Sequence, residues 1–402
     1  MKQYIALLRQ ERVVRRLSLI QLISYFGAWF SNVAIYTLLI QIDVDASVVA
    51  FVAMLHFIAG VVQTPFSGVV IDRMSPKKLM LMLIAVEMIS TFLLVLVNSH
   101  DDLLLLYLLI FLKMAAASFY FTTEMSLLPK ILEGKDLQIA NEIHSIIWSL
   151  SYTTGMALSG FVVYSFGIKA AFIIDGFMFV SAFVLLANLQ LQVEMIEMQE
   201  GFFSMIKDTF VYLKKSPLAL HLMLIHAFVG FSAFDALVAL MVDSFYASVI
   251  ATSLGLGLLH ASRAVGLVVG PMVLGKILNN KRLVYIFYAQ AAAIFLWAYV
   301  MEDFYLSLAA SVVVGFFTTT LWSYSYTLLQ KNIEERYYGR VVAYNDMLFL
   351  STAAFVSFMI GQLASYGMGL QMIAVILGVG FIVGGVYFAL IIKYRNLREI
   401  EG

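Results

Sequence analysis

Long apolar runs follow one another from end to end of this 402-residue chain, separated by short charged or glycine- and proline-containing segments. A helix needs roughly 20 predominantly apolar residues to cross the hydrocarbon core of a bilayer. Breaking the runs at the polar segments predicts twelve spans, at 17–41, 47–71, 79–98, 103–125, 138–166, 169–190, 217–242, 248–275, 283–301, 304–329, 340–366 and 369–393. Only tight turns at Gly167 and Gly367 separate the fifth span from the sixth and the eleventh from the twelfth. The sequence therefore predicts an all-α integral membrane protein with twelve transmembrane helices.

Composition agrees with this class and excludes others. The chain is 62 % hydrophobic and 12 % charged, whereas a soluble domain is about 25 % charged. Because it has no cysteine, it forms neither disulfides nor thiolate metal sites. The formal net charge is zero, which gives no basis for a nucleic-acid partner. The first apolar stretch runs to about residue 40, too long for the core of a secretory signal peptide, so it counts as the first span.

The distribution of basic residues orients the spans. With both termini placed in the cytoplasm, 22 of the 25 lysines and arginines fall in the termini and in loops on the cytoplasmic side. Lys169 falls in an outer loop, and Lys113 and Arg263 lie inside spans. This bias is what the positive-inside rule requires, and a frame error of one span would destroy it. We therefore expect a multi-pass protein embedded in a lipid bilayer, with both termini cytoplasmic.

The longest polar segment divides six spans from six. It predicts an N-terminal six-helix bundle over 1–190, a cytoplasmic linker over 191–216 and a C-terminal six-helix bundle over 217–402. Apolar residues recur at helical spacing within the linker, at Phe202, Phe203, Met205, Ile206, Phe210 and Leu213. The segment is therefore either a helix lying on the inner membrane surface or a plain linker.

The two halves resemble each other in sequence. Pro65 before a basic loop in the first half corresponds to Pro271 in the second, and Gly160 corresponds to Gly361 at an offset of 201. Parallel six-helix repeats of this kind form two pseudo-symmetric bundles with a substrate site near mid-membrane between them.

A charged loop joins the second and third spans. It contains Gly68, Asp72, Arg73, Lys77 and Lys78, with a proline that stops helix propagation. One interpretation is an ordinary basic loop that obeys the positive-inside rule. The spacing also resembles the loop between helices two and three of the major facilitator superfamily of transporters. That resemblance implies that Asp72 locks the outward-open state by pairing across the inner face, with Arg73 and Lys78 supporting it.

Two further segments carry the resemblance to a particular branch. The stretch 127–142 is similar to the loop before helix five in bacterial macrolide efflux pumps and enterobactin-type siderophore exporters, and 329–341 is similar to the matching loop before helix eleven. The glycine-proline signature of drug antiporters is reduced to Gly155 and Gly160 without proline. The resemblance implies a monomer in a bacterial-type inner membrane, built as two bundles that rock around a central cavity.

Nothing in the sequence predicts an enzyme, a cofactor or a metal site. The chain has no Gly-x-x-x-x-Gly-Lys-Ser/Thr phosphate loop, so ATP is not its energy source. Ionisable residues inside spans are expensive and therefore mark function. Lys113 and Glu87 lie at mid-depth in spans four and three, whereas Asp175 and Glu142 are expected near span ends. Lys113 and Glu87 either neutralise each other structurally or couple transport to protons, since many proton-coupled relatives have an arginine near the place of Lys113.

The second half has its own candidates. Arg263 lies at mid-depth in span eight with His260 three residues before it on the same face, and Asp235 lies in span seven with His226 nine residues earlier. We expect an Asp235–Arg263 pair between the two helices, acting either as a proton-sensitive gate or as a static ion pair. Each histidine alone is more often a satisfied core residue than a proton carrier.

Aromatic and weakly polar residues on four spans are the predicted lining of the substrate cavity. They are Trp29, Asn32, Tyr36, Phe119, Tyr120, Phe231, Phe234, Trp322 and Tyr326. Such rings suit a sizeable amphipathic organic molecule, although many of the aromatics, 14 % of the chain, pack between helices or face lipid.

The function expected is secondary active export of a drug, macrolide or siderophore, driven by the proton gradient through alternating access. One alternative of the same fold, from neighbouring branches, is transport of lysophospholipids or metal ions. An alternative of another class is a membrane sensor or scaffold that transports nothing.

Overall fold

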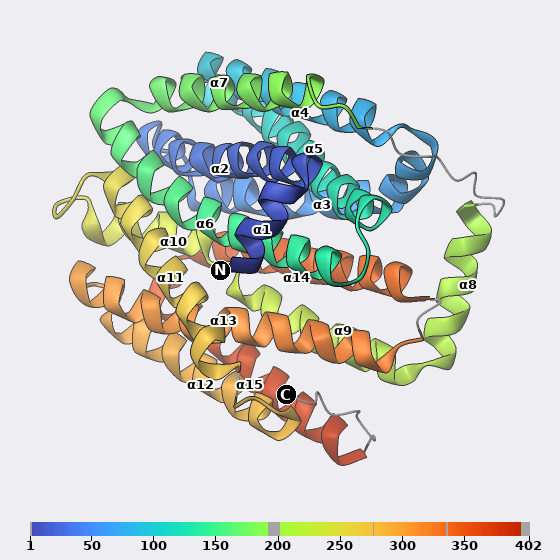
Figure 1. The fold of residues 1–402 in the computed structure, drawn as a ribbon. Coiled ribbons are helices and arrows are strands. Elements are labelled where there is room, and N and C mark those ends of the chain that lie inside the picture. The colour runs from blue at the N-terminus through green and yellow to red at the C-terminus, as the bar shows by residue number, and fades with distance from the viewer. Residues whose placement is uncertain (1, 192–201, 276, 335–336, 395–402) are drawn as a thin grey trace. The chain divides into compact units, whose positions relative to one another are not determined.

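The computed structural model describes residues 2–191, 202–275, 277–334 and 337–394. Within these ranges every regular element is helical (Figure 1). The elements are α1 Lys2–Gln10, α2 Arg12–Gln41, α3 Ala46–Arg73, α4 Pro76–Leu93, η1 Leu94–Leu96, η2 His100–Asp102, α5 Leu103–Ile131, α6 Gly134–Phe166, α7 Ile168–Ala187, α8 Phe202–Lys215, α9 Pro217–Ala227, η3 Phe228–Ser232, α10 Asp235–Met241, η4 Val242–Tyr246, α11 Thr252–Leu274, α12 Asn280–Val300, α13 Phe304–Asn332, α14 Tyr338–Ser365 and α15 Leu370–Tyr394.

Twelve helical segments of the described chain are long and apolar enough to cross a membrane. This confirms the predicted all-α fold with twelve membrane-spanning helices. Helices satisfy their backbone hydrogen bonds internally, which is the condition for crossing a bilayer core.

The contacts divide the chain into two compact units. The first unit comprises Met1–Asp43, Val62–Gln199 and Ser253–Gly257, and the second comprises Val44–Val61, Glu200–Thr252 and Leu258–Gly402. Helices α3 and α11 are thus each divided between the units. The domain boundaries expected from the sequence stay a prediction.

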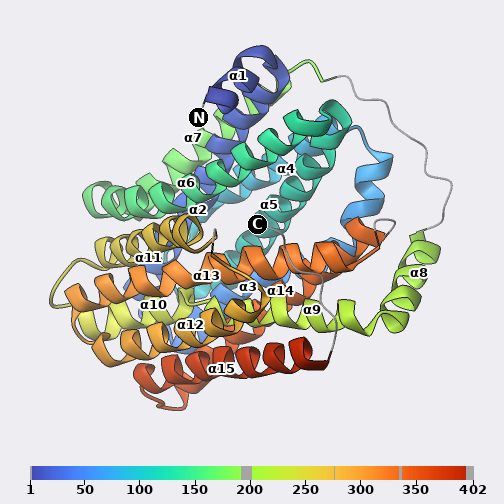
Figure 2. The same cartoon turned by 60° about the horizontal axis from the view of Figure 1, so that its bottom comes forward.

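Inside each unit at least two helices each pack on two others. In the first unit α2 lies against α6 and α7, and α4 lies against α5 and α7 (Figure 2). In the second unit α12 lies against α13 and α15, while α9 packs on α13 and α14. Fully buried aromatic side chains fill both units, for example Phe179 on α7 and Phe381 on α15.

Glycines form the two tight turns that the sequence predicts. Gly167 follows the end of α6 with φ +85°, and Gly367 lies between α14 and α15 with φ +81°. Side-chain-bearing residues rarely adopt this left-handed conformation, so glycine allows these two short turns between helices.

The glycines matched by the internal repeat both permit close helix packing. A Cβ built on Gly160 would meet the backbone of Ser253 and Gly257 in the first unit. A Cβ built on Gly361 would overlap Ala50 in the second unit. Small residues are how membrane helices approach one another closely.

The seventh span departs from the expectation of one continuous helix over 217–242. Its α-helix ends at Ala227, a 3-10 turn follows over Phe228–Ser232, and α10 begins at Asp235. The chain packs closely against α14 here: a Cβ built on Gly230 would lie 2.9 Å from Thr352. A carboxylate in the first turn of α10 is favoured by the helix dipole.

The predicted linker contains a helix, α8, that packs on the second unit. Tyr212 of α8 stacks on Tyr337 with ring centroids 4.1 Å apart, and its hydroxyl accepts a hydrogen bond from the backbone N–H of Glu334 at 3.0 Å. The ring of Phe210 lies 5.3 Å from that of Tyr344 on α14, and Phe210 remains 57 % exposed. Residues 192–201 and the side chains of 202–207 lie outside the described part, and the interfacial position of α8 stays a prediction.

Candidate functional site

Each unit holds a cluster of buried charged or titratable side chains at the depth of the membrane spans. In the first unit the Lys113 ammonium on α5 lies 2.8 Å from the Asp175 carboxylate on α7 and donates to the Ser31 hydroxyl on α2 at 2.7 Å. The Ser31 hydroxyl in turn donates to Asp175. All three residues are at most 2 % exposed. They form one closed triangle of charge-assisted hydrogen bonds.

Local sequence makes room for this triangle. A Cβ at Gly27, one turn before Ser31, would overlap Asp175 Oδ1. One turn after Asp175, the ring of Phe179 lies 5.2 Å from the Lys113 ammonium, close enough for a cation–π contact. The lack of a side chain at Gly27 and the ring of Phe179 together position the ion pair.

The partner of Lys113 differs from the one considered from sequence. Lys113 pairs with Asp175 rather than with Glu87, and Asp175 is fully buried rather than near a span end. Glu87 on α4 is 2 % exposed and lies within electrostatic reach of both. Sequence spacing shows approximately how deep in the membrane a charged residue lies, but it does not show which neighbouring helix supplies its partner.

A second buried polar group lies further along the first unit and was not singled out from the sequence. Tyr25 on α2 donates to Glu124 on α5 at 3.4 Å, and Gln21 on α2 is hydrogen-bonded to His144 on α6. His144 also lies edge-on to Tyr25, 5.7 Å between ring centroids. Glu124 and His144 are 2 % and 6 % exposed. The available signal was one acid near the end of an apolar run, which resembles an ordinary span end.

The second unit arranges its charges more loosely. His260 Nδ1 on α11 lies 3.8 Å from Asp235 Oδ1 at the start of α10. Arg263 on α11 donates to the carbonyl oxygen of Ser232 at 2.8 Å and lies 5.0 Å from the ring centroid of Phe234. The expected Asp235–Arg263 salt bridge is therefore not formed in this structure. At the break in the seventh span the Ser232 carbonyl accepts both the N–H of Phe234 at 2.9 Å and the guanidinium of Arg263.

A small cavity lies beside this arginine. Its lining includes Phe234, His260, Arg263, Trp297 and Ser311, and its volume of about 10 Å³ is near that needed for one water molecule.

His226 is the centre of an aromatic group in the second unit. It is fully buried, its Nδ1 is 2.8 Å from the Ser325 hydroxyl, and its ring contacts Trp322, Tyr326 and Phe349 with centroids 5.5–5.6 Å apart. Trp322 stacks on Tyr326 at 5.1 Å and is 40 % exposed. The sequence named three of these residues for two different roles, and the structure brings them together.

The other predicted cavity residues are divided between the units. In the first unit Trp29 lies edge-on to Tyr152 at 4.7 Å, and Asn32 is buried with both amide atoms lacking a partner among the described residues. Tyr36 and Tyr120 are buried and Phe119 is partly buried.

In the second unit two phenylalanines from the predicted cavity pack against other rings. Phe231 contacts Phe228 and Phe381, and Phe234 lies 5.4 Å from Trp297. The assignment of these residues and those of the first unit to one substrate site stays a prediction.

The loop between the second and third spans is partly described. Lys77 donates to the carbonyl oxygen of Ala187 at 2.8 Å, and Arg73 and Lys78 are exposed. Gly68 and Asp72 lie in α3, but their side chains are outside the described part, so the conformational-lock role stays a prediction.

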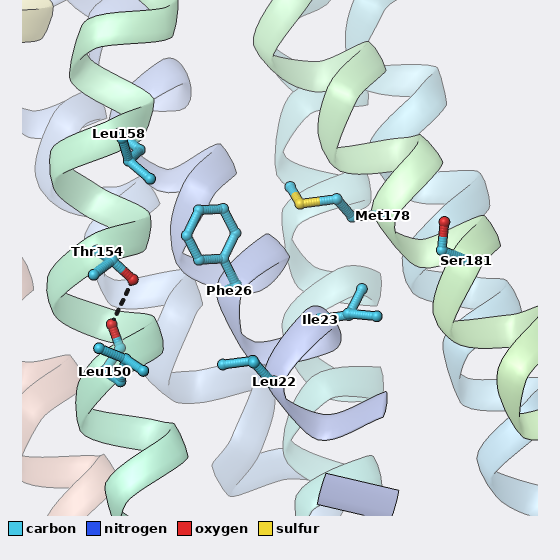
Figure 3. A pocket seen from close by; sticks show the side chains of 8 residues that line it. All are labelled: Leu22, Ile23, Phe26, Leu150, Thr154, Leu158, Met178 and Ser181. Carbon is cyan, nitrogen blue, oxygen red and sulfur yellow. Dashed lines mark hydrogen bonds between the residues drawn. The ribbon is translucent and has the colours of Figure 1, made fainter. Parts of the chain in front are cut away.

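A cavity of the first unit has no charged side chain in its lining. Figure 3 shows Phe26 of α2 between α6 and α7. The cavity has a volume of about 550 Å³ and is almost wholly apolar. Its lining residues are Leu22, Ile23, Phe26, Leu150, Thr154, Leu158, Met178 and Ser181. The Thr154 hydroxyl donates a hydrogen bond to the Leu150 carbonyl at 2.7 Å. Because this polar group already has a partner, the cavity suits a hydrocarbon chain.

Comparison with known proteins gives a family and a fold. The family model described as Major Facilitator Superfamily matches residues 17–345. No curated protein sequence matches the chain.

Among solved structures, two crystal structures of the nucleoside transporter NupG are similar. One, of a point mutant, has TM-score 0.74 and 13 % identity, over 94 % of this chain and 99 % of that one. The other has TM-score 0.71 and 13 % identity, over 96 % and 100 %. A D-xylose-proton symporter has TM-score 0.75 and 10 % identity, over 94 % and 97 %. At these identities the likeness concerns the fold alone.

Proposed function

Because this chain belongs to the major facilitator superfamily, we propose that it is a proton-coupled exporter of an amphipathic organic molecule, such as a drug, macrolide or siderophore. The family match and the twelve spans make it a multi-pass secondary transporter. Coupling ion, substrate and direction are our proposal, as are the cytoplasmic termini, the bacterial-type inner membrane and the monomeric state.

The observation that carries proton coupling is the environment of the Lys113–Asp175 pair. Both charges are at most 2 % exposed, and a third ionisable group, Glu87, lies within their electrostatic reach. Two carboxyl groups, Asp175 and Glu87, lie near one cation, Lys113. In the interior of a membrane protein an isolated charge is strongly disfavoured. Gain or loss of one proton therefore changes the charge balance of the site and favours a different packing of the helices that carry it.

The aromatic group around His226 supports an amphipathic substrate. Trp322 is 40 % exposed and stacks on Tyr326, and the buried His226 ring lies against both. Flat apolar surfaces with few polar groups are typical of sites for sizeable organic molecules. The outward direction rests on the resemblance of 127–142 and 329–341 to macrolide and enterobactin exporters.

Transport of a labelled macrolide into proteoliposomes tests the proposal. With an acidic interior, outward proton flow should drive accumulation above equilibrium, and a proton carrier that dissipates the gradient should abolish it. Counterflow without a gradient should persist. Macrolide accumulation that is the same with and without the pH gradient would contradict proton coupling.

The apolar cavity of the first unit favours one alternative, lysophospholipid transport. A thermal-shift screen of the purified protein against macrolides, siderophores and lysolipids separates the classes, because a ligand that binds only the folded protein raises its stability. Stabilisation by lysolipids alone would favour the alternative. For metal-ion transport and for a non-transporting sensor we expect no stabilisation by any of the three.

A further inference from the structure

A row of polar side chains runs along α5 from the ion pair toward the end of the helix that carries Lys130. Lys113, Tyr120 and Glu124 are seven and four residues apart, which places them on one face of the helix. All three are at most 2 % exposed. At 1.5 Å per residue, Glu124 lies about 16 Å along the axis from Lys113.

A second polar row on α2 accompanies the first. Gln21, Ser24 and Ser31 follow one another at helical spacing and are at most 2 % exposed. At one end Ser31 contacts Lys113, and at the other Gln21 contacts His144. The two rows therefore connect the same two polar clusters of the first unit.

Several buried atoms in these rows, or in the His144 side chain beside them, make no hydrogen bond to the described residues. They are Ser24 Oγ, Tyr120 Oη and His144 Nε2. Burying a polar group without a partner is costly, and water that satisfies such groups is part of many protein interiors. The rows thus contain groups suited to hold water between the clusters.

Two tyrosines lie near the two carboxyl groups outside the salt bridge. Tyr25 and Tyr120 each lie within electrostatic reach of both Glu87 and Glu124. Glu124 is contacted by Tyr25 from α2, and His144 of α6 lies beside that same Tyr25 ring. No lysine or arginine of the described chain forms a salt bridge with Glu124 or Glu87.

We propose that these groups form a proton pathway in the first unit, from the Asp175–Lys113 pair through Glu87, Tyr120 and Tyr25 to Glu124. The inference rests on the proton-coupled function proposed above and assigns its proton route. It makes Glu124, which the sequence did not indicate, the terminal proton carrier.

Inward proton flow moves one proton from group to group along this row. A proton reaching Asp175 neutralises its carboxylate and breaks the salt bridge, while Lys113 keeps its positive charge. Asp175 then gives that proton to a Glu87 carboxylate oxygen and returns to its pair. A tyrosine hydroxyl accepts the proton from Glu87 as it donates its own to Glu124, and Glu124 releases it at the Lys130 end of α5.

Glu124→Gln tests the pathway with little structural change. The glutamine side-chain carbonyl can still accept the Tyr25 hydrogen bond, but it carries no exchangeable acid proton. Glu133→Gln, at a solvent-exposed acid nine residues later, is the matched control. In proteoliposomes we expect Glu124→Gln to reduce pH-driven accumulation of a labelled macrolide about tenfold or more, while counterflow and the control stay near wild type.

The outcomes separate the two proposals. Wild-type behaviour of Glu124→Gln in both assays would overturn the pathway and leave proton-coupled export standing. A wild-type protein without pH-driven accumulation would overturn the proposed coupling itself.

Infrared titration of the purified protein gives a readout that needs no substrate. The carboxyl band of wild type should lose one component in Glu124→Gln, and the titration of the remaining buried carboxyls should shift. Unchanged titration of the remaining groups would show that Glu124 is not linked to Glu87, and would overturn the pathway even if transport were impaired.

Discussion

The charged clusters of the two units neutralise their cations in different ways. Lys113 in the first unit has a carboxylate partner at 2.8 Å and a hydroxyl at 2.7 Å, all buried. Arg263 in the second unit binds the carbonyl of Ser232 and the face of Phe234, and Asp235 is left to His260 at 3.8 Å. The first cluster is closed by side chains, whereas the second depends on a break in a helix backbone.

The cation of the first cluster is thus neutralised by a side-chain carboxylate, and that of the second is bound by a backbone carbonyl. A proton alters the first cluster directly, because it removes one of two paired charges. The arginine of the second cluster is tied to the conformation of 228–234, so regular helix formation there would remove the carbonyl that it binds. We therefore expect substitutions to affect stability more in the first cluster than in the second.

The largest effect is expected for Lys113→Met. It leaves the Asp175 carboxylate buried without a cation, which costs about 3–5 kcal/mol of unfolding free energy. Reversible denaturation in detergent micelles measures the change, with Lys169→Met on the exposed turn as the control near zero.

The double variant Lys113→Met with Asp175→Asn tests the cause. Removing both charges should restore a substantial part of the lost stability, although pH-driven transport stays lost. A double variant as unstable as the single one would show that packing, rather than the unpaired carboxylate, dominates.

Arg263→Met is expected to cost less, about 1.5–3 kcal/mol, the range for a hydrogen bond to a charged group. The Ser232 carbonyl then loses the guanidinium but keeps the N–H of Phe234 at 2.9 Å, and no salt bridge is broken. The same denaturation measurement applies. A loss equal to that of Lys113→Met would abolish the distinction between the clusters.

Gly27→Ala tests how tightly the first cluster is built. The new methyl group would overlap Asp175 Oδ1, and overpacking of this kind costs about 1–3 kcal/mol. Gly369→Ala is the control, since its Cβ would meet only a flexible glutamine side chain at 3.4 Å. An unchanged or raised stability of Gly27→Ala would mean that the triangle can shift freely.

Trp322→Ala should have the smallest effect on stability, within about 0.5 kcal/mol, because the side chain is 40 % exposed. It should nevertheless reduce the thermal shift that a macrolide produces. Tyr299→Ala, at an 88 % exposed aromatic, is the control for general loss of surface aromatics. Equal ligand responses in both variants would remove Trp322 from the proposed substrate site.

Much of the fold follows from local sequence, but the pairing of charges does not. The apolar runs and the turns at Gly167 and Gly367 predict the helices found. The partner of Lys113 and the break before Asp235 were not predicted. In the sequence Asp175 resembles an acid near a span end. The residues Phe228–Phe234 are mostly apolar, like the rest of the span, so the pattern gives no sign of the break.

The sequence by itself determined the number of spans, because the free energy of burying a helix in lipid is a sum over its own residues. Tertiary structure decided that Lys113 meets Asp175, that Arg263 meets a carbonyl, and that Glu124 and His144 are buried. Those contacts depend on the rotation and depth of each helix against its neighbours, which packing sets and no single span encodes.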